Sequence, residues 1–152
     1  MVRGEFCPCA PWGANGSFGK RPLITLKKYD PDGVYKPIAA YHHCIEIPAG
    51  ARWLVTAGQV DIAPDGELVQ DPEAQIAQTW KYVAALLAAA DMGPEDLVKL
   101  TIYLLNAEDF VTNRKYRAEY LGDAKCAATA VLVSALADPA MVIEVDVMAA
   151  KA

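Results

Sequence analysis

The sequence has no excess of basic residues, no membrane-spanning apolar run and few cysteines, and each shortage excludes a class of protein. Its 19 acidic and 14 basic residues give a formal net charge of -5, which disfavours nucleic acids and anionic membranes as partners because both attract concentrated positive charge. No apolar run approaches the roughly 20 residues that span a bilayer. Residues 1–6 lack the apolar stretch of a signal peptide, so we expect a cytoplasmic protein with no membrane partner.

The four cysteines do not have the spacing of a redox motif or of a common metal site. A single residue separates Cys7 from Cys9, whereas the redox motif is Cys-x-x-Cys. Cys7, Cys9, His42 and His43 have the side chains that bind zinc, but their spacing fits no common zinc finger. We therefore expect reduced thiols, as is usual in the cytoplasm, and no metal.

The composition is typical of one globular domain with a buried core. The chain has 152 residues, of which 54% are hydrophobic and 22% charged. Residues 1–22 combine Cys, Pro and Gly without any period, which indicates an irregular N-terminal arm or an expression remnant. We expect residues 23–152 to form a single domain.

Periodicity along the remaining chain predicts two helices and six strands. Asp71 is a favourable N-cap before Pro72, and the apolar residues that follow recur at helical spacing until Gly93. Asn106 is expected to cap a second helix, which ends at Gly122. The expected strands cover residues 23–28, 43–47, 52–60, 97–105, 127–134 and 142–149.

The turns between these strands predict how the strands pair. Short turn-forming segments at 48–50 and 135–139 suggest that the strands on either side of each form a β-hairpin. We expect an α+β fold in which both helices cover one face of a single mixed sheet.

The last two expected strands contain a candidate pocket. Glu144 and Asp146 fall on one face of the final strand, and Ala128 and Ala130 leave room on the strand before it. An acid beside a wall of small residues is consistent with a binding site. An ordinary half-exposed strand with its carboxylates in water gives the same pattern, and these two strands alone favour that interpretation.

Five stretches occur in an order that is typical of one protein family. They are residues 52–60 (RWLVTAGQV), 64–69 (PDGELV), 92–99 (MGPEDLVK), 109–116 (DFVTNRKY) and 142–146 (VIEVD). In this order they resemble the RidA/YjgF family, also labelled L-PSP endoribonuclease, from about Pro37 to Ala150.

The resemblance implies a chorismate-mutase-like α+β fold and a homotrimer with small-molecule sites in the clefts between subunits. It also implies hydrolysis of reactive enamines and imines, such as 2-aminoacrylate, to keto acids and ammonia. Neither a metal nor an organic cofactor is implied.

The resemblance also implies a set of site residues. Glu144 matches an acid that holds water or relays a proton, Tyr41 matches a pocket tyrosine, and Asn113 matches a substrate-binding asparagine. His43 stands where many members have glutamine, and a histidine there suits proton transfer near neutral pH. His43 is also compatible with a purely structural role as a hydrogen-bonded strand residue.

The sequence departs from the family where the substrate should be held. Ala128 replaces the arginine that clamps the substrate carboxylate, with Thr129 beside it, and Ala130 stands where cysteine is frequent. Ala57 replaces a pocket serine before Gly58. Because an arginine fork makes two charge-assisted hydrogen bonds to a carboxylate, we expect inefficient hydrolysis of 2-aminoacrylate.

Two consequences of the missing arginine remain open. The pocket accepts a larger, less acidic ligand, or another cation replaces the arginine from a different direction; the candidates are His42, His43, Arg114, Arg117 and Lys125. Three functions follow: a deaminase-like hydrolase of a small metabolite, a non-catalytic ligand-binding trimer, and an endoribonuclease or translation inhibitor. The acidic composition argues against the third.

Overall fold

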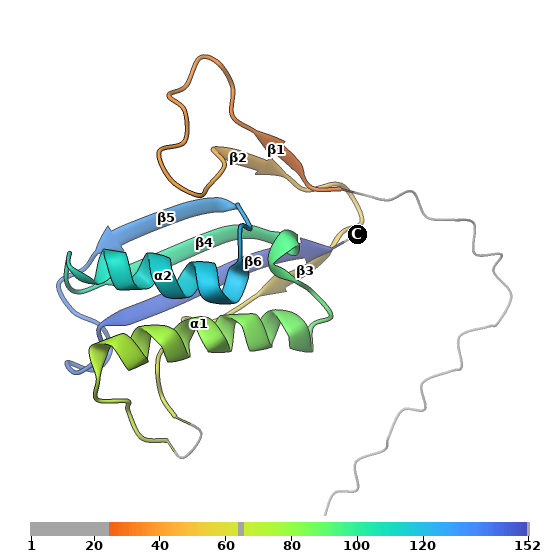
Figure 1. The fold of residues 1–152 in the computed structure, drawn as a ribbon. Coiled ribbons are helices and arrows are strands. Elements are labelled where there is room, and N and C mark those ends of the chain that lie inside the picture. The colour runs from red at the N-terminus through yellow and green to blue at the C-terminus, as the bar shows by residue number, and fades with distance from the viewer. Residues whose placement is uncertain (1–24, 64–65, 152) are drawn as a thin grey trace, which may run out of the picture.

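The computed structural model describes residues 25–63 and 66–151, in which two helices pack on one face of a four-stranded sheet (Figure 1). The strand order is β3-β6-β4-β5. The strands are β3 (Arg52–Val55), β4 (Leu97–Leu104), β5 (Ala127–Leu132) and β6 (Ile143–Lys151). β4 and β5 are parallel, whereas β6 runs antiparallel to both β3 and β4, so the expected mixed α+β sheet is confirmed. Within the described ranges, no helix is long and apolar enough to cross a membrane.

A separate two-stranded ribbon lies beside β5 (Figure 1). It pairs β1 (Lys27–Tyr29) with β2 (Cys44–Glu46) in antiparallel register. The predicted hairpin between β2 and β3 is therefore wrong. The turn at 48–50 does form, since the Ala51 amide donates to the Pro48 carbonyl, but it connects two different sheets.

The predicted hairpin between β5 and β6 is also wrong, because both strands pair with β4 from opposite sides. The α2 helix lies between β4 and β5 in the chain, and such a crossover brings the next strand back parallel to the first. The segment 133–142 then carries the chain past the end of β4. Val133 donates to the Leu104 carbonyl on one side, and Leu105 donates to the Val142 carbonyl on the other.

The first helix agrees closely with the prediction. α1 spans Pro72–Ala89, and the Asp71 side chain accepts from the Ala74 amide at 2.8 Å. The helix is followed by the short 3₁₀ helix η1 (Pro94–Asp96). The side chains at helical spacing are buried against the sheet: Ile76, Trp80, Val83 and Leu87.

The second helix begins later than predicted. α2 spans Asp109–Leu121 with Glu108 at its N-cap, and Asn106 donates from its side chain to the Asp109 carboxylate instead of capping the backbone. Gly122 ends the helix at φ 58, a conformation that glycine adopts without a steric penalty.

One buried polar contact joins the two helices within the core. The Trp80 indole nitrogen donates to Oδ1 of Asn113 at 3.0 Å, and the two side chains are 0% and 3% exposed. This contact fixes Asn113 at the point where the core meets the functional site.

Residues 1–22, which were expected to form an irregular arm, lie outside the described part of the chain.

Candidate functional site

A cavity of about 790 Å³ opens between the loop that follows β1, the edge strand β5 and the helix α2. Its wall contains most of the predicted site residues: Tyr41, His43, Asn113, Ala128, Thr129 and Ala130. These residues lie far apart in the sequence and come from three different elements. The fold therefore brings the tyrosine, the histidine and the asparagine to one cavity.

The small side chains of β5 leave the space that forms part of this cavity. Ala128 and Ala130 pair in register with Leu100 and Ile102, which are buried under the helices, so all four share the helix-covered face. Thr129 pairs with Thr101 on the opposite face. Because β5 is an edge strand, the two methyl groups lie at the rim of the sheet, where a longer side chain would fill the cavity.

His43 is held from two sides. Its ring contacts Tyr35 and Tyr41 edge to face, with centroid distances of 4.9 and 5.5 Å. Nε2 lies 2.6 Å from the Tyr35 carbonyl oxygen. A carbonyl only accepts hydrogen bonds, so Nε2 carries the hydrogen and the neutral ring presents Nδ1 as an acceptor. This arrangement leaves one ring nitrogen of His43 for proton transfer.

Asp30, which directly follows β1, orders both histidines. Its carboxylate accepts from the His43 backbone amide at 2.8 Å and lies 2.7 Å from Nδ1 of His42. The hydrogen bond from the His43 backbone amide lowers the pKa of Asp30 below its ordinary value, and the contact with the His42 ring has the same effect to a smaller extent. Because Asp30 and His42 are twelve positions apart in the sequence, no local sequence signal predicts this contact.

The cavity is rich in positive charge. Lys99, Arg114 and Arg117 line it together with both histidines, and no described lining residue carries a carboxylate. Arg117 donates to the Ala40 carbonyl at 2.7 Å, and burial lowers the pKa of its guanidinium. Lys125, another candidate replacement for the family arginine, does not line this cavity.

Glu144 lines a second, smaller hollow of about 330 Å³. This hollow also contains Gly58, Tyr103 and Asp146. Burial, and then the carboxylates of Asp146 and Glu144, raise the pKa of Tyr103. Glu144 pairs in register with Tyr103 on the sheet face opposite the helices, so within one chain it does not share the large cavity with Asn113. Ala57 is exposed and lines neither hollow.

Nothing in the described part of the chain brings three or more possible metal ligands together. His42 and His43 line the large cavity, while Cys7 and Cys9, the other members of the zinc alternative, lie outside the described residues.

Comparison with known proteins gives a consistent result. The family model described as Endoribonuclease L-PSP matches residues 34–151. A RutC family protein of Pyrococcus horikoshii is 36% identical over 118 residues, which span 76% of this chain and 90% of that protein. A crystal structure from the conserved Rid protein family of Yersinia pestis is 31% identical with a TM-score of 0.72, and covers 83% of this chain and 98% of its own. A 2-iminobutanoate/2-iminopropanoate deaminase of Escherichia coli is 36% identical over 67 residues, or 43% of this chain and 52% of its own length.

Proposed function

Because the chain belongs to the Endoribonuclease L-PSP family, in which its relatives include RutC and Rid proteins, we propose that it hydrolyses a small enamine or imine to a carbonyl compound and ammonia. The Escherichia coli relative that is named as an imine deaminase supports this reaction class. The observation that carries the proposal is the cavity that joins Tyr41, His43 and Asn113.

The reaction requires one water molecule and three proton transfers. Tyr41 or a protonated His43 donates a proton to the imine nitrogen, and Glu144 accepts a proton from water as the new C–O bond forms and the C=N π bond breaks. A proton then moves from the added hydroxyl to nitrogen, the C–N bond breaks, and ammonia leaves with the carbonyl product. No redox partner is needed, and no metal or organic cofactor enters the proposal.

We further propose that the complete site lies between subunits of a homotrimer. The sheet face without helices exposes three apolar side chains, Trp53, Val55 and Val131, which are 49%, 65% and 38% exposed. Exposed apolar patches of this kind favour association. The small hollow contains Glu144 and Asp146, whereas the large cavity is cationic, so the two are complementary in charge across an interface.

Turnover of imines tests the reaction directly. Imines generated in solution by an amino-acid oxidase decay spontaneously, and the protein should accelerate their conversion to keto acid and ammonia. Glu144→Gln should reduce this acceleration by roughly 10²-fold or more, the usual contribution of a positioned acid or base. Glu119→Gln, on the exposed surface of α2, is the matched control and should leave the rate unchanged. Equal rates for both variants would exclude Glu144 from the reaction.

A non-catalytic ligand-binding trimer is the second candidate function, favoured by the alanine at position 128. Ligand-dependent thermal stabilisation without any ammonia release would support it.

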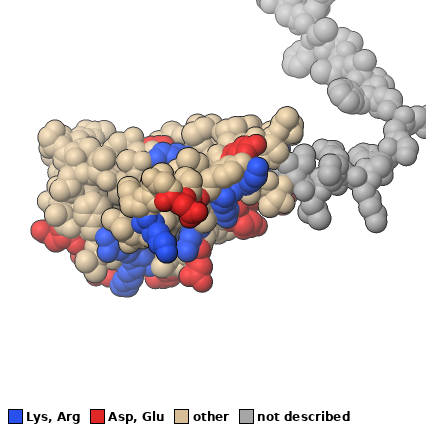
Figure 2. All heavy atoms as spheres, turned by 90° about the horizontal axis from the view of Figure 1, so that it is seen from above, with Lys and Arg blue, Asp and Glu red and all other residues tan. Residues whose placement is uncertain are grey.

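Ribonuclease activity has less support. In the face seen from above, acidic and basic side chains are interspersed and form no continuous basic stripe among the coloured residues (Figure 2). Salt-sensitive RNA binding at physiological ionic strength would restore that candidate.

A further inference from the structure

One face of α2 carries polar groups into the large cavity. The helix residues in the cavity wall are Phe110, Asn113, Arg114, Arg117 and Ala118. Their spacing of three and four residues places them on a single stripe of the helix. The stripe begins with an apolar ring and continues with an amide and two guanidinium groups, so α2 supplies several hydrogen-bond donors to the cavity.

The amide of Asn113 presents an unused donor. Its Oδ1 accepts from Trp80, and an indole nitrogen can only donate, so the amide oxygen faces the core and Nδ2 faces away from it. Nδ2 has no hydrogen-bond partner among residues 25–63 and 66–151. Asn113 is 3% exposed and lies in the cavity wall, and its Nδ2 is not fully enclosed by protein. An unpaired donor in the wall of a cavity favours a ligand that brings an acceptor oxygen.

Arg114 is the next residue of α2 after Asn113, and all of its guanidinium donors are available to a ligand. The other two permanent cations of the cavity already donate hydrogen bonds within the protein. Arg117 donates to the Ala40 carbonyl, and Lys99 donates to the Thr129 hydroxyl. In contrast, Arg114 lines the cavity without a hydrogen bond or ion pair to any residue that the structure describes. A free fork beside a free amide donor matches the two oxygens of a carboxylate.

The charged side chains in the cavity wall also favour a negatively charged ligand. The chain has a net charge of -5, yet the described wall of this cavity contains three permanent cations and no carboxylate. A cleft of one sign attracts oppositely charged ligands. The wall of the cavity thus carries a net positive charge, although the chain as a whole is acidic.

We infer that Arg114 and the Asn113 amide bind the carboxylate of the ligand, so that the anion anchor lies on α2 and not on β5. This inference rests on the proposed function and names its substrate class. With the anchor on the helix, the space beside Ala128 and Ala130 is left for carbon atoms of the ligand. A cavity of about 790 Å³ has room for more than a short chain. The substrate class is therefore imines of keto acids with a branched or aromatic side chain.

Calorimetric binding of the keto-acid products tests the anchor without requiring turnover. The probes are 4-methyl-2-oxopentanoate, the shorter 2-oxobutanoate, and the uncharged 4-methyl-2-pentanone. The branched keto acid should bind most tightly, and added salt should weaken it. Arg114→Gln should weaken it by roughly 10–100-fold, because two charge-assisted hydrogen bonds are lost. Arg114→Lys should restore only part of the affinity, because lysine is a point charge without the fork.

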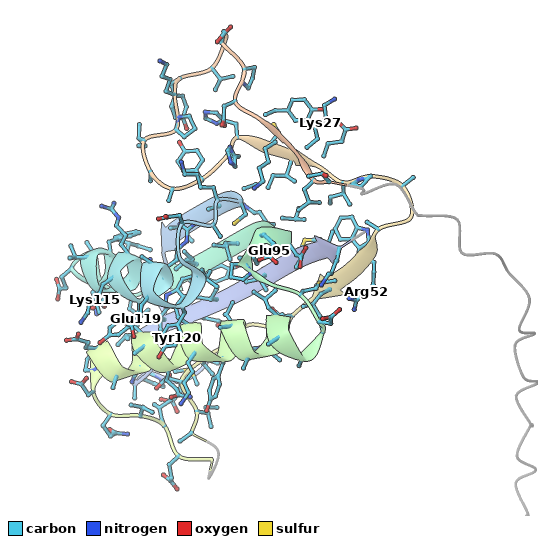
Figure 3. All side chains as sticks on the ribbon, turned by 45° about the vertical axis from the view of Figure 1, so that its right-hand side comes forward. Lys27, Arg52, Glu95, Lys115, Glu119 and Tyr120 are labelled. Carbon is cyan, nitrogen blue, oxygen red and sulfur yellow. The ribbon has the colours of Figure 1, made fainter. Side chains whose placement is uncertain are left out.

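Arg52→Gln is the matched control. Arg52, the first residue of β3, donates to the carbonyl of Ala90, the C-cap of α1, and it lies across the domain from Lys115 on α2 (Figure 3). This variant should bind the branched keto acid like the unmodified protein. If Arg114→Gln and Arg52→Gln bind it equally, or if the uncharged ketone binds as tightly as the acid, the inference is wrong.

Different results would reject the carboxylate anchor and the proposed imine hydrolysis. Imine hydrolysis by the unmodified protein, with unchanged binding by Arg114→Gln, would reject the anchor and retain the proposed function. Arg114-dependent binding of the keto acid without any imine hydrolysis would retain the anchor and reject the reaction.

Discussion

Gly58 and Glu144 are in such close contact that a side chain on the glycine would displace the acid. A Cβ atom built on Gly58 would lie 1.7 Å from Oε1 of Glu144. The two residues lie on neighbouring segments, since Gln59 forms an isolated bridge with Val145 of β6. The absence of a side chain at position 58 therefore leaves the space that the Glu144 carboxylate occupies.

Gly58→Ala should reduce imine turnover while leaving the fold intact. The clash involves the flexible end of Glu144, so the carboxylate moves and the backbone does not have to. We expect a decrease in kcat of roughly 10²-fold, the size of a lost general acid or base. Gly33→Ala is the control, because nothing lies within 4 Å of a Cβ at that position. A variant Gly58→Ala with normal kcat would show that the position of Glu144 does not matter for the reaction.

Asn113→Ala should destabilise the protein as well as weaken ligand binding. It leaves the fully buried Trp80 indole without an acceptor, which costs about 1–3 kcal/mol in the free energy of unfolding. Urea denaturation measures this loss. Trp80→Phe removes the donor, so the double variant should lose less than the sum of the single variants. Strict additivity would mean that the hydrogen bond does not contribute to stability.

Asp61→Asn should stabilise the protein at neutral pH. Asp61 is 0% exposed, and neither carboxylate oxygen has a hydrogen-bond partner in the described part of the chain. Burial outweighs the opposing effect of the nearby backbone amides of Asp61 and Val69, and it raises the pKa of Asp61 above its ordinary value of 3.8. The unfolded chain therefore ionises first, and the free energy of unfolding decreases as the pH rises from about 3.8 to the raised pKa.

Because asparagine cannot ionise, it removes this loss. We expect an increase of about 0.5–2 kcal/mol in the free energy of unfolding at pH 7, the range of a single stabilising substitution. The difference between the two proteins should diminish below the ordinary pKa of aspartate. Urea denaturation between pH 3 and pH 7 measures both effects, and a pH-independent difference would contradict the explanation.

Val131→Asp should disrupt self-association. Val131 is 38% exposed and pairs in register with Tyr103 on the sheet face that lacks helices. Burying an aspartate at a subunit interface would leave a charge without a partner, so the proposed trimer should dissociate. Analytical ultracentrifugation measures the assembly. Val111→Asp, which changes a 74% exposed residue of α2, should leave it intact. A monomeric unmodified protein would reject the composite site.

Local sequence determined the helices and the central strands. Asp71 and Pro72 begin α1 because side-chain capping and a fixed φ act within one turn of the chain. The alternation along β6 places every second residue in the core, and its burial pattern follows that alternation. Asn113 lies in one of the family-like stretches, whereas Tyr41 and His43 were proposed from their positions in the resemblance, and the fold brings all three to one cavity.

Only the tertiary structure decided which segments meet. A turn between two strands indicates where the chain reverses, but not which strands pair. β2 and β5 each pair with the strand that precedes them in the chain, β1 and β4, across a longer connection, and not with the strand that follows the short turn. The contact of Asp30 with both histidines depends on β1 pairing with β2. The separation of Glu144 from Asn113 arises because successive residues of a strand point to opposite faces of the sheet, and only one of those faces is covered by helices.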